Sequence, residues 1–145
     1  MKFLIMHGPN INRLGKRWPE KYGHHTLADI TADVDTTAKT LGVEVEHVQS
    51  NTEGDLVDWL HDRQDTADGV VLNPAGLTYY GWSLYDGLHD TGLPIAIVHI
   101  GQFWAYERGR RPDIFAELAT IHLTGAGWRG YQFALRALHG KINAA

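Results

Sequence analysis

The residues whose types and spacing best suit chemistry lie in positions 7–26, directly after the apolar run KFLIM. Within this segment Arg17 comes shortly before Tyr22. A fixed cation close to a phenol favours the phenolate, and a phenolate can act as a general base. By residue type alone Tyr22 would be a packing residue, and Asn10 and Asn12, which follow Gly-Pro, would be turn residues that bond their own backbone. The segment predicts a proton-abstracting pair only if the fold brings Arg17 and Tyr22 together.

Two further polar residues each close an apolar run, Asn73 after GVVL and His99 after PIAIV. Histidine exchanges protons near neutral pH, so His99 is a candidate general acid, although a histidine in this setting is more often structural. Asn73 precedes Pro74 and can equally be a simple strand terminator. The nine histidines show no zinc-binding spacing such as HExxH, so no metal site is expected.

Short β-rich runs alternate along the chain with longer amphipathic ones, which predicts strands and helices in turn. Thr26 can cap the first helix and Gly42 can end it. The predicted strands are 2–7, 43–48, 69–73, 94–99 and 120–125, and the predicted helices are 27–41, 53–65, 80–90 and 128–139.

Strands joined by helices of this length predict βαβ units and therefore an α/β fold, a doubly wound parallel sheet of five strands with helices on both faces. Ligands bind such sheets beyond the carboxyl ends of the strands, at the point where the strand order reverses. The loops to examine are therefore 7–26, 73–79 and 99–112. The first is far longer than an ordinary βα loop, which favours a lid or binding loop.

The totals fit one domain spanning residues 1–145, with no linker or repeat. Because the chain has no cysteine, disulfides and thiolate chemistry are excluded, and a reducing compartment such as the cytoplasm is expected. No apolar stretch is long enough for a membrane span. The net charge of -4 and a pI near 6.1 argue against nucleic acid as a partner.

The segment GAGWRG, residues 125–130, formally matches the glycine pattern of dinucleotide-binding loops. It belongs to the last βα unit, however, and neither a later strand nor an acidic residue about 20 positions on follows it. These glycines are expected to allow a tight turn and close helix packing, and no cofactor is expected.

Taken together, GPNINRLGKRWPEKYG, QSNTEGDLVDWLHD, DGVVLNPAGLTYY, LPIAIVH and GAGWRGYQFALRAL occur in an order and spacing that resembles the type II 3-dehydroquinate dehydratases over essentially the whole chain. The resemblance implies a flavodoxin-like five-stranded fold, a cofactor-independent enzyme and a homo-oligomer, usually a dodecamer of four trimers. It also implies dehydration of 3-dehydroquinate, or of a related cyclic hydroxy-ketone, through an enolate.

Carried over by position, the resemblance implies that Tyr22, activated by Arg17, abstracts the proton next to the ketone. Asn12 would hold the water that stabilises the enolate oxygen, and His99 would protonate the departing hydroxyl. These roles supply the base, the oxyanion stabiliser and the acid that such a reaction requires.

The resemblance also implies a set of substrate-binding positions. Asn73 and Arg110 would bind hydroxyl groups, and the backbone of Ile100 and Gly101 would receive a carboxylate. Asp86 matches a position that reaches the site of a neighbouring subunit.

The chain departs from the family pattern on the walls that face the lid. Tyr79 stands where the family has a substrate-binding histidine, and Gly101 replaces a serine. Ile97 replaces a glutamate that supports the acid histidine, on the same face of the strand as His99. Trp104 and Tyr106 place aromatic rings where polar groups are usual.

Three interpretations follow from this uneven pattern. The chain could be a dehydroquinase that tolerates these changes, or a repurposed enzyme acting on a larger, more aromatic substrate in specialised metabolism. The third is a catalytically silent homologue retained for ligand binding or assembly.

Overall fold

A five-stranded parallel sheet forms the centre of the computed structural model, which describes residues 1–107 and 111–145. The strand order is β2-β1-β3-β4-β5, so the flavodoxin-like fold expected from the sequence is confirmed. The strands are β1 (Lys2–His7), β2 (Glu44–Gln49), β3 (Gly69–Asn73), β4 (Ile95–His99) and β5 (Ile121–Thr124).

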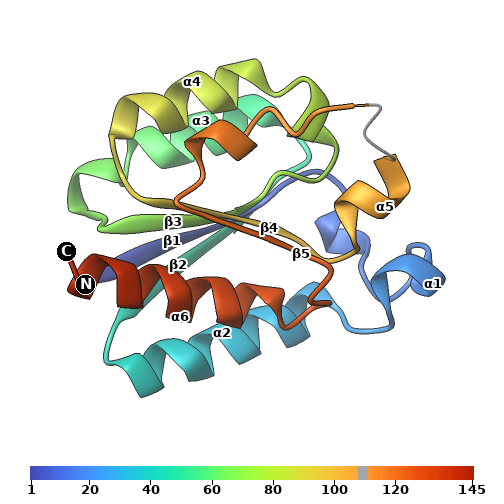
Figure 1. Ribbon diagram of the computed structural model, residues 1–145, viewed down its shortest axis with the longest axis horizontal. Coiled ribbons are helices and arrows are strands. Elements are labelled where there is room, and N and C mark those ends of the chain that lie inside the picture. Colours follow the sequence, from blue (N-terminus) through green and yellow to red (C-terminus); the bar gives the residue numbers. More distant parts are fainter. Residues whose placement is uncertain (108–110) are drawn as a thin grey trace.

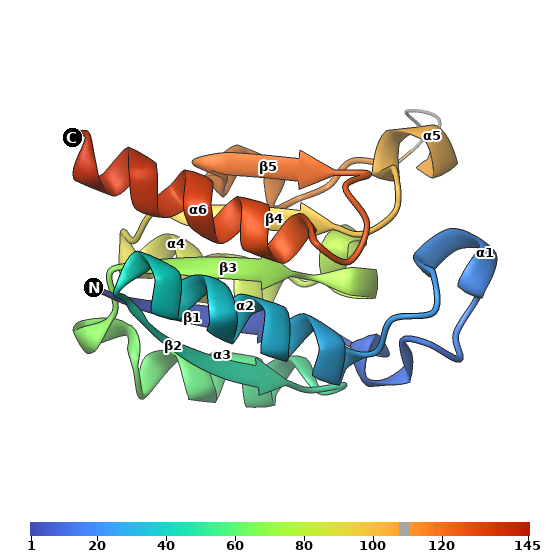
Figure 2. The same cartoon turned by 90° about the horizontal axis from the view of Figure 1, so that it is seen from below.

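Helices cover both faces of this sheet (Figure 1). On one face lie α2 (Leu27–Leu41) and α6 (Gly130–Asn143), and on the other lie α3 (Glu53–His61) and α4 (Trp82–Thr91). The short helices α1 (Pro19–Tyr22) and α5 (Phe103–Glu107) both lie beyond the carboxyl ends of the strands (Figure 2). Single 3-10 turns occur at Ile11–Arg13, Gln64–Thr66, Ala75–Tyr79 and Ala116–Leu118.

Helix boundaries differ from the sequence prediction by only a few residues. Thr26 caps α2 as predicted and forms a capping box with Asp29, and Gly42 ends the helix in the left-handed conformation. The helix expected over 53–65 stops at His61 and continues only as a 3-10 turn.

Alternation along β1 shows how the two hydrophobic cores arise. Phe3 and Ile5 pack into the core beneath α2 and α6, whereas Leu4 and Met6 pack into the core beneath α3 and α4. All four side chains are fully buried. Because successive side chains of a strand point to opposite faces, one continuous apolar run serves both cores.

The chain reverses its direction of travel across the sheet at β1, which lies between β2 and β3. The connection after β1 leads to one neighbour, and the connection after β2 returns to the other. The carboxyl ends of β1 and β3 therefore open a crevice, which is where ligands bind in sheets of this topology.

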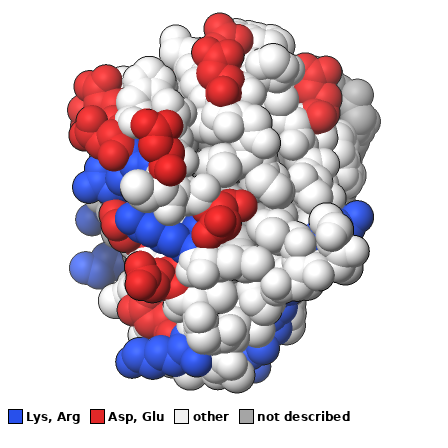
Figure 3. All heavy atoms as spheres, turned by 90° about the vertical axis from the view of Figure 1, so that its left-hand side faces the viewer, with Lys and Arg blue, Asp and Glu red and all other residues white. Residues whose placement is uncertain are grey.

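The opposite end of the sheet, near the chain termini, carries interspersed acidic and basic side chains (Figure 3). Glu46 pairs there with Lys2 at 2.5 Å and with Arg63 at 2.8 Å. None of the described helices is both long enough and apolar enough to cross a lipid bilayer.

We expect the Leu135→Ala variant to lower the free energy of unfolding by about 2–5 kcal/mol, because it leaves a cavity in the core beneath α6. Arg136→Ala, an exposed neighbour on the same helix, should change that free energy by less than about 0.5 kcal/mol. Urea unfolding at one protein concentration measures both. Equal effects of the two variants would contradict this packing of α6.

Candidate active site

A cavity with a volume of about 380 Å³ lies at the carboxyl ends of β1, β3 and β4. Its size falls in the range of small-molecule sites. The walls come from the three loops that the sequence singled out, 7–26, 73–79 and 99–112. Residues that line the cavity include Asn10, Arg17, Lys21, Tyr22, Asn73, Thr78, Tyr79, His99, Ile100, Gly101, Phe103, Tyr106 and Arg111.

The loop 7–26, which we call the lid, brings two cations to the ring of Tyr22. The Arg17 guanidinium carbon lies 5.7 Å from the Tyr22 ring centre, and the Lys21 ammonium nitrogen lies 5.2 Å from it. Helix α1 fixes this arrangement, with Pro19 at its first turn and Gly23 at its end with φ 78°. The fold thus makes the Arg17–Tyr22 pair that the sequence only suggested, and Lys21 adds a second cation.

The two lid asparagines are placed differently from the prediction. Both are exposed, but Asn10 lines the cavity and Asn12 is not part of the lining. The Asn10 backbone is left-handed, with φ 68°, and its N–H donates to Asn51 Oδ1 at 2.8 Å. Asn tolerates this conformation better than most residues, so the turn suits Asn10, the lid asparagine that lines the cavity.

The ends of β3 and β4 supply the polar base of the cavity. Asn73 is buried, and its Oδ1 accepts a hydrogen bond from the Ala75 N–H at 3.0 Å. His99, Ile100 and Gly101 line the cavity in succession, as the strand-end rule predicted.

Aromatic rings form much of the wall opposite the lid. Tyr79 stacks on Phe103 with ring centres 6.1 Å apart, and the Arg111 guanidinium lies 4.0 Å from the Tyr79 ring centre. Tyr106 also faces the cavity, with the Lys21 ammonium 4.0 Å from its ring centre. Trp104 is exposed and lies outside the lining.

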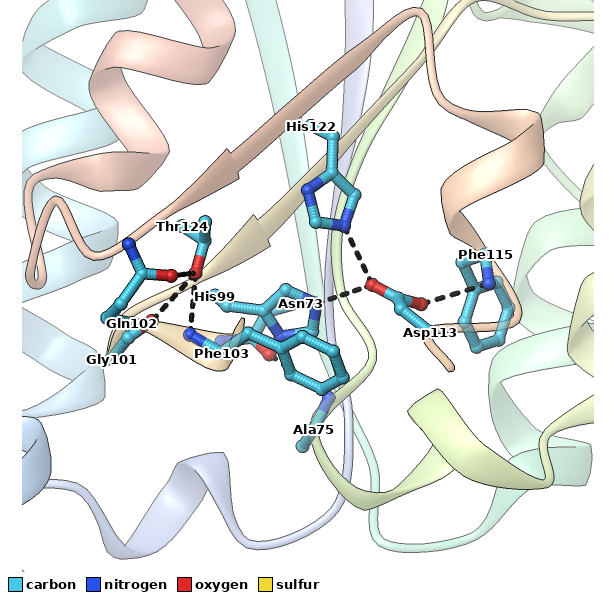
Figure 4. Close-up of polar contacts among 10 residues, drawn as sticks. All are labelled: Asn73, Ala75, His99, Gly101, Gln102, Phe103, Asp113, Phe115, His122 and Thr124. Carbon is cyan, nitrogen blue, oxygen red and sulfur yellow. Dashed lines mark hydrogen bonds and ion pairs between the residues drawn. The ribbon is translucent and has the colours of Figure 1, made fainter. Parts of the chain in front are cut away.

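A carboxylate that the sequence did not single out contacts His99. Asp113 Oδ2 lies 2.6 Å from His99 Nε2 and 2.8 Å from His122 Nε2 (Figure 4). Burial opposes ionisation of Asp113, but hydrogen bonds from His122 and His99 outweigh it and lower its pKa to about 2. Asp113 is therefore a carboxylate at any working pH. Because it reaches His99 from a loop that follows α5, no spacing in the sequence reveals the contact.

Ile97 is fully buried in the apolar core beneath α3 and α4, two positions before His99 on the same face of β4. Its pairing partner on the neighbouring strand β5 is His122. Beside His99, this face of the sheet therefore carries the apolar Ile97 on β4 and the imidazole of His122 on β5.

Two predicted site residues lie away from the described cavity. Asp86 is exposed on α4 and does not line the cavity, so any role it has would be toward another molecule. Arg110 lies outside the described residues.

Behind Asn73 the site rests on a buried pair, Tyr131 and His7. The Tyr131 hydroxyl lies 3.1 Å from His7 Nδ1, and burial raises the pKa of Tyr131, so it stays a neutral phenol. Burial, with a smaller contribution from His47, lowers the pKa of His7 to about 3. Both rings are therefore uncharged supports beneath the cavity floor.

The loop 125–130 behaves as the sequence predicted. Gly125 and Gly127 have φ of 81° and 68°, and a Cβ on Gly130 would stand 3.3 Å from Val98 Cγ1. The glycines provide a tight turn and close packing of α6 on β4.

The fold and the cavity at its switch point define a small α/β enzyme. A family model described as dehydroquinase class II matches residues 1–139. The chain therefore belongs to the type II dehydroquinase family, and the related proteins below are named as hydro-lyases of that family.

Individual relatives agree with this assignment. A 3-dehydroquinate dehydratase of Roseiflexus castenholzii (strain DSM 13941 / HLO8) is 44% identical over 140 residues, covering 97% of this chain and 89% of its own. That of Bacillus subtilis (strain 168) is 40% identical over 136 residues, covering 94% and 92%. The crystal structure of type II dehydroquinase from Propionibacterium acnes matches with a TM-score of 0.89 at 33% identity, covering 96% of each chain.

The Ile97→Glu variant should be less stable than the parent by about 3 kcal/mol or more, because it buries a carboxylate among the apolar side chains beneath α3 and α4. Ile97→Val, the matched control, should cost about 1 kcal/mol. Urea unfolding at neutral pH compares them. A glutamate variant as stable as the valine variant would contradict the packing of this face.

The depressed pKa of His7 predicts a pH dependence of stability. In the unfolded chain His7 becomes protonated below its ordinary pKa of 6.5, whereas in the folded protein its pKa is about 3. Stability therefore falls as pH falls through this window, by up to about 1.4 kcal/mol per pH unit from this residue.

The measurement is urea unfolding between pH 7 and pH 4. The His7→Asn variant should show a shallower loss of stability than the parent, and His89→Asn, at a side chain that is 68% exposed, should keep the parental slope. Parallel slopes for the parent and His7→Asn would show that His7 is not held neutral by burial.

Proposed function

We propose that this protein dehydrates 3-dehydroquinate, or a closely related cyclic hydroxy-ketone, by abstraction of the proton next to the ketone and passage through an enolate. The observation that carries the proposal is that Arg17, Tyr22 and His99, from two distant segments, line the same cavity. The names of the relatives support 3-dehydroquinate as the substrate.

Tyr22 is the base in this proposal. The Arg17 guanidinium carbon and the Lys21 ammonium nitrogen lie 5.7 and 5.2 Å from its ring centre, so two positive charges stand beside the proposed base. Tyr131 is a poor alternative, because it is fully buried and its pKa is raised by that burial.

The enolate oxygen and the substrate carboxylate need positive or hydrogen-bonding partners. Asn10 takes the oxyanion role for which Asn12 was predicted, since Asn10 lines the cavity. The backbone at Ile100 and Gly101 receives the carboxylate. A Cβ on Gly101 would stand 3.5 Å from the Lys21 side chain, so this cation lies beside the carboxylate position.

The leaving hydroxyl is assigned to His99, which lines the cavity opposite the lid. His99 gives it a proton, so that it departs as water. Asn73, at the end of the neighbouring strand, would orient the substrate hydroxyls together with Arg110. Base, oxyanion partner and acid all come from the protein, so the proposed reaction uses no cofactor.

The assembly and location remain proposals as well. We propose a cytoplasmic homo-oligomer built from trimers, a dodecamer in its full form, with Asp86 directed at a neighbouring subunit. The exposure of Asp86 on α4 is compatible with such a contact.

The aromatic wall favours a second candidate, a larger and more aromatic substrate for the same chemistry. Tyr79, Phe103 and Tyr106 present rings to the cavity, and such surfaces bind apolar or aromatic groups well.

Tyr22→Phe should lower kcat for 3-dehydroquinate by about 100-fold to 10,000-fold with little change in KM, because the base is lost and the ring that packs is kept. Tyr80→Phe is the matched control, since Tyr80 is 61% exposed and outside the cavity lining. Ultraviolet absorbance of the conjugated enone product follows turnover.

The same assay separates the interpretations. Efficient turnover by the parent protein supports the dehydroquinase and argues against a changed substrate. No turnover by a folded parent overturns 3-dehydroquinate as the substrate, and turnover by Tyr22→Phe equal to that of Tyr80→Phe overturns the role of Tyr22.

A further inference from the structure

One oxygen of Asp113 receives two imidazoles at hydrogen-bond distance, His99 from the end of β4 and His122 from β5 (Figure 4). The Asp113 side chain has no exposed surface. Its other oxygen accepts a hydrogen bond from the Phe115 N–H at 2.9 Å. The carboxylate is thus held from three sides, and it cannot rotate away from His99 without breaking buried hydrogen bonds.

This contact decides which nitrogen of His99 can serve the reaction. A carboxylate is an acceptor only, so Nε2 of His99 must carry a proton and donate it to Asp113. Nδ1 is then the nitrogen that can exchange a proton with a bound molecule. The ring is also clamped flat against Phe103, with ring centres 4.7 Å apart and planes 24° apart.

The support reaches His99 from outside its own strand. Ile97, on the same face of β4, is buried among apolar side chains and cannot accept a hydrogen bond. His122 is the pairing partner of Ile97 on β5, and Asp113 lies in the segment that leads into that strand.

We propose that Asp113 is a positioning residue that holds the acid His99 in one tautomer and orientation, and that His122 fixes the Asp113 carboxylate in place. This inference rests on the proposed function, because it takes His99 as the acid of the dehydration. In the step concerned, the enolate oxygen re-forms the ketone C=O bond, and the electron pair of the enolate C=C bond moves to form a new C=C bond to the carbon whose C–O bond breaks. The electron pair of that bond leaves with the oxygen, which takes the Nδ1 proton of His99 and departs as water. His99 is left neutral, with its Nε2–H still donated to Asp113.

The same three side chains could also offer ligands to a metal ion, since two imidazoles and a carboxylate meet at one point. Nitrogen and oxygen ligands at about 2.0–2.2 Å from a first-row metal stand roughly 3 Å or more from one another. The two contacts of Asp113 Oδ2, at 2.6 and 2.8 Å, are shorter and match hydrogen bonds. The geometry therefore favours the positioning role.

The first test is kinetic. Asp113→Asn should lower kcat for 3-dehydroquinate by about 10-fold to 1,000-fold while KM changes by less than about threefold. In a His99→Ala background the same change should have no further effect, because Asp113 acts through His99. Asp55→Asn, at an exposed carboxylate on α3 that bonds only Ser50 in the described structure, should leave kcat unchanged. An equal loss from Asp113→Asn in the parent and in the His99→Ala background would overturn the proposal.

The second test needs no substrate, so it stands even if the protein does not act on 3-dehydroquinate. Nitrogen-15 NMR of the histidine rings should show His99 protonated at Nε2 in the parent and in Asp55→Asn, and a mixture of tautomers in Asp113→Asn. An unchanged His99 signal in Asp113→Asn would overturn the proposal. If Asp113→Asn does not fold, Asp113→Glu takes its place in both tests, because its longer side chain moves the carboxylate away from Nε2.

The third measurement addresses the metal. Elemental analysis of the purified protein, before and after chelation, should find less than about 0.1 metal ion per chain and unchanged kcat. Near-stoichiometric metal whose removal alters the His99 and His122 signals would assign the cluster to a metal and overturn the positioning role.

Discussion

Hydrogen bonding of β1 to β3 across the reversal of strand order is the constraint on which the site depends. Because β1 pairs with β3 in parallel, and β3 with β4 likewise, the carboxyl ends of the three strands lie at the same edge of the sheet. The long lid can reach the strand-end polar residues only because of this register. His7 pairs with Asn73 at that edge, so the support and the floor of the cavity are adjacent.

Electrostatics around the cavity are divided between its two walls. The lid carries the cations, with Lys21 close to the rings of both Tyr22 and Tyr106. The opposite wall carries the buried carboxylate of Asp113 behind His99. Positive charge thus lies beside the proposed base, and negative charge lies behind the proposed acid.

Much of this could be predicted from the sequence because it depends on local patterns. Apolar runs bounded by turn residues located all five strands, and Thr26 and Gly42 located the ends of α2. Asn73 and His99 were found because polar residues at strand ends of a parallel sheet share one edge. The site features that could not be predicted from the sequence depend on backbone turns and on contacts between residues far apart in the chain. Asn10, in a left-handed turn, lines the cavity in place of Asn12, and Asp113 bonds His99 from 14 positions further along the chain, where β5 pairs with β4.

The contact between Asp113 and His99 bears on how divergent relatives are compared. The resemblance places Ile97 where the family is expected to have a glutamate, so a comparison of sequences alone predicts that His99 has no acidic partner. In three dimensions an acidic oxygen is bonded to the same imidazole, contributed by a segment 14 positions away in the chain. Retained chemistry in such families is therefore better judged by which atoms surround a reacting group than by which alignment columns are conserved.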